Sequence, residues 1–280
     1  MNPEKLLAAV MLIALTFGAG LQVNWDHLVA ILKNTSLIAR ALIANFLIVP
    51  LLGVALAKLF ALPAPVATGF LLMAIAPGVP FVLASVRKRG GRLGLAVALA
   101  LLLPALSILT IPVTAALVLP TAAQADLPMA RFLSTLVLFQ LLPLLAGIAV
   151  AGRAPASAAK LVRPVELIFF AAAIGLLAVL APTMAHGIAA VYGSHGMLAM
   201  LCIVLLSFAV GWAMGGPARE DRRILGLGTA LRNIGICALI AESAFPDKLI
   251  VATVLVYFII QFVVTTIVGV YFARTVAKGA

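Results

Sequence analysis

The sequence predicts an all-α membrane protein, and three observations lead to that fold class. Of the 280 residues, 65% are hydrophobic and 10% are charged, whereas an average soluble domain has about 25% charged residues. The mean hydropathy is +1.27. The apolar residues fall into runs long enough to cross a bilayer, which takes about 20 residues per helix. These runs use the whole length, so we expect one integral membrane domain over residues 1–280.

Nine apolar runs, each bounded by polar residues, are the expected transmembrane helices. They cover residues 5–23, 35–61, 65–86, 93–119, 129–151, 162–184, 197–215, 224–245 and 249–273. The first run is not expected to be a cleaved secretory signal, because Glu4 weakens its basic start and no small-residue cleavage site follows Phe17. Cys202 and Cys237 lie inside such runs and are predicted to be core residues.

The basic residues are unevenly distributed between the two sides of the predicted domain. Of the 19 Lys and Arg residues, fourteen lie on the side of the odd-numbered loops and the C-terminus, and four lie on the opposite side. Because Lys and Arg accumulate in cytoplasmic loops, we expect the N-terminus outside and the C-terminus in the cytoplasm of a multi-pass protein, in a bacterial inner membrane. This topology also explains the net charge of +11, so we do not predict binding to nucleic acid.

The remaining basic residue, Arg232, lies inside the eighth run. An arginine near the centre of a membrane helix costs about 2.5–3.5 kcal/mol on insertion, so its presence requires a reason. If this helix begins near Ile224, Arg232 lies about 12 Å deep at about 1.5 Å per residue. Two interpretations stay open. Arg232 binds an anion or compensates a charge in a protein-lined cavity, or it is buried structurally, in an ion pair with Glu166 or against helix-end carbonyls.

Two of the predicted helices are interrupted. Residues 226–235 are rich in glycine and in hydrogen-bonding side chains, which favours a break whose freed backbone groups contact a ligand. The third helix contains Pro77 and Pro80 on either side of Gly78 and Val79, and two prolines remove two backbone donors. Either break alone indicates only a kink. Because each interrupted helix is second from last in its half of the chain, the pair predicts an inverted-repeat transporter with a site near the bilayer midplane.

Amide side chains lie inside two further runs. Asn45 lies five residues before Pro50, and it either bridges two helices or binds substrate if the second helix lies beside the breaks. Gln140 precedes Pro143 and is predicted to form an interhelical hydrogen bond at a kink. No run carries paired carboxylates, a Ser/His pair or metal-ligand spacing, so the sequence does not predict an enzyme.

Four segments, in their order and spacing, resemble the bile-acid:sodium symporter family over nearly the whole chain. They are Phe17-Gly18-Ala19-Gly20-Leu21, the segment 44–50, Ala76-Pro77-Gly78 followed by Lys88-Arg89-Gly90-Gly91, and Ala230-Leu231-Arg232-Asn233. The resemblance implies inverted repeats of five helices, a panel domain, and a core domain in which two discontinuous helices cross. This chain resembles the nine-helix members, with a first repeat at about 5–119 that lacks one helix and a second at about 129–273. The third and eighth helices are then the crossing pair.

The resemblance fails at the family's sodium-ligand positions. Members typically read Pro-Gly-Gly-x-x-Ser-Asn at the first crossing, and this chain has Val82 and Leu83 in place of the Ser and Asn. At the second crossing the Glu of Glu-x-x-x-Gln-Asn is Gly228 and the Gln is Arg232. Hard cations require several oxygen ligands and gain from a carboxylate. We therefore predict no metal site and no cofactor, with sodium possible but not favoured.

The sequence thus predicts a secondary transporter that moves a small organic anion by alternating access, without the usual sodium coupling. The expected partners are this anion and the lipid bilayer. The substrate-binding residues are predicted to be Asn45, Pro77, Gly78, Pro80, Thr229, Arg232 and Asn233. Two alternatives stay open: a sodium-coupled symporter of bile-acid-like anions with non-standard ligands, and a transport-incompetent sensor or scaffold on the same fold.

Overall fold

The computed structural model describes residues 2–23, 29, 31, 33–78, 93–121, 123 and 129–277, and most of them are helical. Seven helical segments are long and apolar enough to cross a membrane. They are Pro3–Leu21, Thr35–Leu59, Leu95–Val118, Leu133–Arg153, Pro155–Pro182, Gly196–Met214 and Lys248–Phe272. Two shorter apolar helices, Ala64–Ile75 and Ile234–Ala244, cover parts of the third and eighth predicted runs, the first beginning one residue before its run. The helical membrane class is confirmed, and the count of nine spans stays a prediction.

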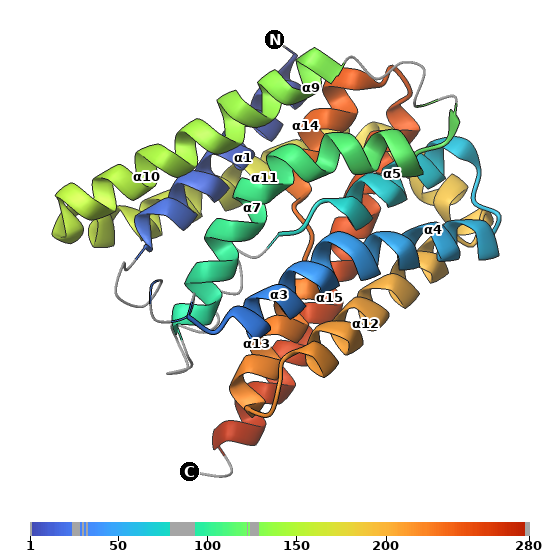
Figure 1. Ribbon diagram of the computed structural model, residues 1–280. Helices are drawn as coiled ribbons and strands as arrows, with labels where there is room; N and C mark the ends of the chain where they lie inside the picture. The colour runs from blue at the N-terminus through green and yellow to red at the C-terminus, as the bar shows by residue number, and fades with distance from the viewer. Residues whose placement is uncertain are drawn as a thin grey trace.

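One group of helices contains α1 (Pro3–Leu21), α10 (Leu142–Arg153) and α11 (Pro155–Gly193), which lie together in Figure 1. Their backbones approach closely at two glycines. A Cβ on Gly20 would lie 2.8 Å from the backbone nitrogen of Ile148, and one on Gly147 would lie 2.9 Å from the Cα of Gly20. Small residues at such contacts let membrane helices pack through their backbones.

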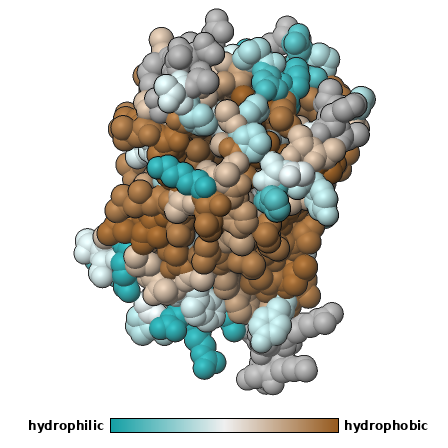
Figure 2. Space-filling view, turned by 90° about the vertical axis from the view of Figure 1, so that its right-hand side faces the viewer, coloured by the Kyte–Doolittle hydropathy of each residue, from teal (hydrophilic) through white to brown (hydrophobic). Residues whose placement is uncertain are grey.

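A second group of helices includes the two interrupted ones, whose pieces are α5 (Ala64–Ile75) at the first break and α13 (Arg219–Ala230) and α14 (Ile234–Ala244) at the second. Its other members are α3 (Thr35–Ile43), α4 (Val49–Leu59), α7 (Leu93–Val118), α12 (Gly196–Met214) and α15 (Lys248–Ala277). A further helix, α9 (Met129–Leu136), leads into α10. On the face that Figure 2 draws, a broad hydrophobic band crosses the middle of the molecule, and most hydrophilic residues are gathered at its two ends. This distribution is expected of helices whose outer faces contact lipid.

Two five-residue π turns interrupt otherwise regular helices. η1 (Ala44–Ile48) joins α3 to α4, and η2 (Val137–Leu141) joins α9 to α10. Each ends two residues before a proline, Pro50 or Pro143. A proline lacks the N–H that would bond the preceding turn, and its ring crowds the carbonyl four residues earlier. Widening this turn to the π spacing accommodates both effects within a continuous helix.

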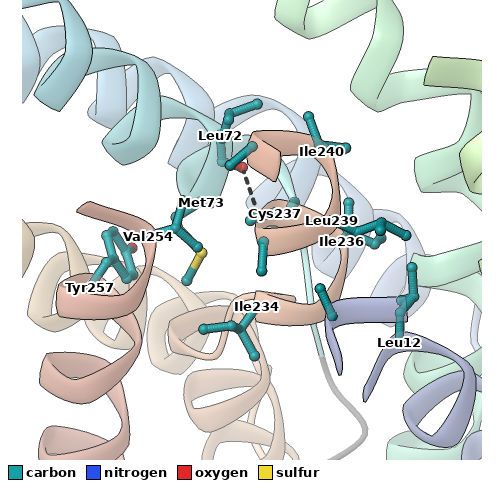
Figure 3. Close-up of a cluster of buried hydrophobic side chains, with 14 of the residues drawn as sticks. Leu12, Leu72, Met73, Ile234, Ile236, Cys237, Leu239, Ile240, Val254 and Tyr257 are labelled. Atoms are coloured by element: carbon teal, nitrogen blue, oxygen red, sulfur yellow. Dashed lines mark hydrogen bonds between the residues drawn. The ribbon is translucent and has the colours of Figure 1, made fainter. Parts of the chain in front are cut away.

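Helix α14 packs against several other helices, among them α1, α5 and α15. Its Cys237 is fully buried, and the Cys237 Sγ donates a hydrogen bond to the backbone oxygen of Leu72 on α5 at 3.3 Å. Figure 3 shows this contact within a cluster of apolar side chains from α1, α5, α14 and α15. Cys237 is thus the core residue that its apolar run predicts, whereas Cys202 is only half-buried.

An ion cluster joins three elements at one end of the molecule. The Lys248 Nζ lies 2.5 Å from a carboxylate oxygen of Glu4 and 2.9 Å from one of Glu242. The N-terminus, the end of α14 and the start of α15 therefore lie on the same side, as the predicted topology requires.

Two predicted boundaries are wrong. Helix α13 begins at Arg219 rather than near residue 224, and α11 covers Pro155–Gly193 rather than 162–184. In α13, Glu220 and Asp221 lie in the first turn, where acidic side chains stabilise the positive end of the helix dipole. A charged segment that hydropathy assigns to a loop therefore extends the helix beyond the apolar run.

Candidate functional site

The two interrupted helices meet at their breaks. After α5 the chain continues in an extended conformation, and Pro77 forms an antiparallel bridge with Arg232, which lies between α13 and α14. The Gly78 N–H donates to the Leu231 oxygen at 3.2 Å, and the Asn233 N–H donates to the Ala76 oxygen at 3.0 Å. Backbone groups that each break frees are therefore satisfied by the other break, as an apolar environment demands. Figure 1 shows the two extended segments beside each other near the centre of the molecule.

Gly78 is required by the closeness of this approach. A Cβ at Gly78 would lie 2.5 Å from the Asn233 nitrogen and 2.7 Å from the Arg232 carbonyl carbon. Real Cβ atoms essentially never lie this close to backbone atoms, so only glycine fits without a shift of the crossing. Gly78 thus holds the crossing together, and its N–H is used within the protein.

Arg232 is the largest fully buried side chain among the described residues, with 1% of its surface exposed. Its Nη2 donates to the Thr229 oxygen in the last turn of α13 at 2.6 Å. Its Nε and Nη1 are buried and have no hydrogen-bond partner in the structure. Among the described carboxylates none pairs with it, so the ion pair with Glu166 is wrong. The contact with a helix-end carbonyl is observed, but it engages only one guanidinium nitrogen.

Asn45 connects the second helix to this site. Its Nδ2 donates to the Ala41 oxygen at 2.9 Å and to the Thr229 Oγ1 at 3.3 Å, and its Oδ1 is buried without a partner. The second helix therefore lies beside the break, which is the condition under which a role in binding was expected. Asn45 bridges two helices and also keeps one acceptor atom free.

Asn233 is the N-cap of α14. Its Oδ1 accepts a hydrogen bond from the Ile236 N–H at 3.2 Å, which satisfies one of the free donors at the helix start. Its Nδ2 is buried and has no partner in the structure. The predicted substrate residue is therefore a structural cap with one donor left over.

Two residues of α15 complete the site and were not predicted. The Gln261 side chain is fully buried and forms two hydrogen bonds with the backbone of Arg232. Tyr257, one turn earlier, is fully buried, and its hydroxyl has no partner in the structure. Figure 3 shows its ring beside Met73 of α5. An amide in the middle of an apolar run was the available signal for Gln261, because the same signal identified Asn45.

The described part of the chain thus brings together six of the seven predicted binding residues. The six are Asn45, Pro77, Gly78, Thr229, Arg232 and Asn233. Gly228 is buried in the last turn of α13, next to Thr229. Pro80, Val82 and Leu83 lie outside the described residues.

The free polar atoms at the crossing are mostly donors. They are the Arg232 Nε and Nη1 and the Asn233 Nδ2, with the Tyr257 hydroxyl and the Asn45 Oδ1. An uncompensated charge in an apolar interior is costly, and an anionic group is the partner that would relieve this cost. Guanidinium groups match the geometry of carboxylates and sulfonates. The arrangement is therefore suited to an organic anion.

Comparison with known protein families matches residues 9–194 to the sodium bile acid symporter family. The match covers about two thirds of the chain, from α1 to the end of α11, and includes the first break but not Arg232. No protein of curated function matches the chain.

Proposed function

The chain belongs to the sodium bile acid symporter family, and from this premise we propose that it moves a small organic anion across the membrane by alternating access. Membership makes it a transporter-type protein rather than an enzyme, and its apolar helices make it an integral, multi-pass membrane protein.

The observation that carries the proposal is the state of Arg232. Its guanidinium is buried at the crossing of two broken helices, no described carboxylate neutralises it, and two of its nitrogens lack partners. Broken helices that meet at mid-membrane are the usual construction of transporter binding sites. We infer that a carboxylate or sulfonate of the substrate binds to this guanidinium, with Asn45 and Thr229 beside it.

The described residues at the crossing favour an anion over a sodium ion. Gly228 offers no side-chain oxygen, the Asn233 Oδ1 is engaged in the cap of α14, and Arg232 is itself a cation. Two unit charges about 4 Å apart repel each other by about 4 kcal/mol at an effective dielectric constant of about 20. This repulsion supports transport without the family's sodium coupling, because Arg232 supplies the positive charge.

The test is uptake of radiolabelled cholate by the full chain in proteoliposomes. Cholate is a carboxylate of the bile acid class that the family name contains. We expect uptake that other carboxylates and sulfonates inhibit, that cholate methyl ester does not inhibit, and that is equal in sodium and potassium buffers. A protein that binds the uncharged ester as well as cholate would contradict an anion site. Specific binding without uptake would favour the sensor alternative.

The orientation is tested by labelling single cysteines, after Cys202 and Cys237 are replaced by alanine. Ser36 and Ser157 are exposed at the predicted cytoplasmic end, and Asp247 is exposed beside the ion cluster at the other end. We expect a membrane-impermeant maleimide to label Asp247→Cys in intact cells and to leave Ser36→Cys and Ser157→Cys unlabelled. The opposite pattern would show an inverted topology.

A further inference from the structure

Gln261 pairs with the backbone of Arg232 at both of its polar groups. Its Oε1 accepts from the Arg232 N–H at 2.9 Å, and its Nε2 donates to the Arg232 oxygen at 3.2 Å. The N–H and C=O of an extended residue point to the same side, and those of its neighbours point to the other side. Leu231 and Asn233 accordingly face the segment 76–78, while Arg232 faces Gln261. The Gln261 amide therefore satisfies the Arg232 N–H and C=O in the way that a second neighbouring strand would.

These two hydrogen bonds hold the Arg232 backbone, and so they fix the position of the Cα from which the side chain extends. Without Gln261 the Arg232 N–H would lose its observed acceptor in an apolar interior, which destabilises the extended conformation. The guanidinium has one other anchor, the bond from Nη2 to the Thr229 oxygen. Thr229 therefore holds the end of the side chain, and at its root Gln261 holds the Arg232 peptide together with the Ile234 N–H, which also donates to the Arg232 oxygen at 3.1 Å.

We propose that Gln261 is the positioning residue of the anion site, holding the Arg232 peptide so that the guanidinium faces the ligand. This inference rests on the proposed function, because it gives Arg232 the role of anion ligand. Gln261 itself does not need to contact the substrate. Without the Gln261 amide the Arg232 guanidinium keeps its charge but is no longer held facing the ligand. The protein should then lose part of its preference for a charged over an uncharged ligand.

Gln140 provides a matched control. It is also a fully buried amide in a membrane helix, and its Nε2 donates to the Pro104 oxygen and to the Ser107 Oγ. Its observed partners contain no charged residue. Methionine has nearly the volume and flexibility of glutamine, so Gln261→Met and Gln140→Met each remove one buried amide with little change in packing.

The experiment measures dissociation constants of cholate and of cholate methyl ester for the purified full chain and both variants. We expect Gln261→Met to weaken cholate binding by about tenfold or more, because the guanidinium loses one charge-assisted hydrogen bond to the cholate carboxylate. The dissociation constant of the ester should stay unchanged. Gln140→Met should leave the ratio of the two constants as in the unsubstituted protein. A parallel loss of both ligands, or an unchanged ratio, in Gln261→Met would overturn the inference. If Gln261→Met does not accumulate, Gln261→Asn, whose amide is one methylene shorter, is measured for the same fall.

Arg232→Gln separates this inference from the proposed function. If Arg232→Gln leaves the preference for cholate unchanged, the anion site itself is refuted. If Arg232→Gln abolishes the preference and Gln261→Met does not, only the positioning role is refuted. When both are correct, Gln261→Met added to Arg232→Gln should cause no further change in the ratio, because Gln261 acts through Arg232.

Discussion

The π turns η1 and η2 are built alike but contact different neighbours. Each ends two residues before a proline, and each carries a fully buried amide, Asn45 in η1 and Gln140 in η2. Asn45 reaches Thr229 beside the break between α13 and α14, whereas Gln140 reaches the Pro104 oxygen and the Ser107 hydroxyl of α7. The same local structure therefore serves a candidate binding site in one place and a helix contact in the other.

The difference between these regions lies in the partners of the amide. Beside η1, Thr229 is bonded through its carbonyl to a buried guanidinium with two unpaired nitrogens. The observed hydrogen bonds of Gln140 involve only neutral groups. A polar side chain in a membrane helix thus indicates that a partner exists, and the charge of its surroundings indicates whether a ligand is expected.

The largest effect is expected from removing the charge that distinguishes the two regions. Arg232→Gln should weaken cholate binding by about 1.5–3 kcal/mol, which is about ten- to a hundredfold. The melting temperature should stay equal or rise, because an uncompensated buried charge is removed. Arg163→Gln, on an exposed position of α11, is the control for loss of an arginine. Unchanged cholate affinity together with a large fall in melting temperature would show a structural role for Arg232.

The crossing itself can be disturbed without altering any polar side chain. Gly78→Ala places a methyl group 2.5 Å from the Asn233 nitrogen, and overpacking of this kind costs about 1–3 kcal/mol. We expect a lower melting temperature and weaker cholate binding, since the backbones must separate where Arg232 is held. Gly193→Ala is the control, because a Cβ there meets nothing within 4 Å. If Gly78→Ala were as stable as Gly193→Ala, the close approach of the breaks would be incorrect.

Paired substitutions in the π turns test the comparison directly. Asn45→Leu and Gln140→Met each remove a buried interhelical hydrogen-bonding group, and each should cost about 1 kcal/mol of stability. Only Asn45→Leu should also weaken cholate binding, because only Asn45 contacts the break. Thermal unfolding and cholate titration of both variants provide the comparison. Equal effects of the two substitutions on affinity would mean that η1 has no special relation to the site.

Much of this comparison follows from the sequence. The apolar runs predict the helices, the prolines and glycines predict both breaks, and the cost of burying a charge identifies Arg232. The condition attached to Asn45, that its helix lies beside the breaks, is met by its contact with Thr229.

The partners of the buried groups were less accessible from the sequence. Glu166 was a candidate partner for Arg232, but in the structure the Arg232 guanidinium donates to the backbone oxygen of Thr229, and the Arg232 backbone is bonded to the Gln261 side chain. Backbone groups are present at every position, so the sequence does not reveal which of them a given side-chain amide will hydrogen-bond. Gln261 lies 29 residues from Arg232, and only the packing of α15 against the break brings them together. The start of α13 was missed because helix-dipole effects extend a helix beyond its apolar run.

The smallest expected effect concerns sodium. A ligand that binds only the folded protein stabilises it by about 2.7 kcal/mol at a hundred times its dissociation constant, which is readily measured as a rise in melting temperature. Since Arg232 repels cations and Gly228 offers no carboxylate, sodium should stabilise the protein no more than potassium at equal ionic strength. Gly228→Glu combined with Arg232→Gln restores the acidic and amide side chains of the family pattern at this crossing, and we expect it to be stabilised more by sodium than by potassium. A sodium-specific rise in the unsubstituted protein would instead place oxygen ligands near the crossing that outweigh the guanidinium, and the contrast between η1 and η2 would then reflect cation binding rather than anion binding.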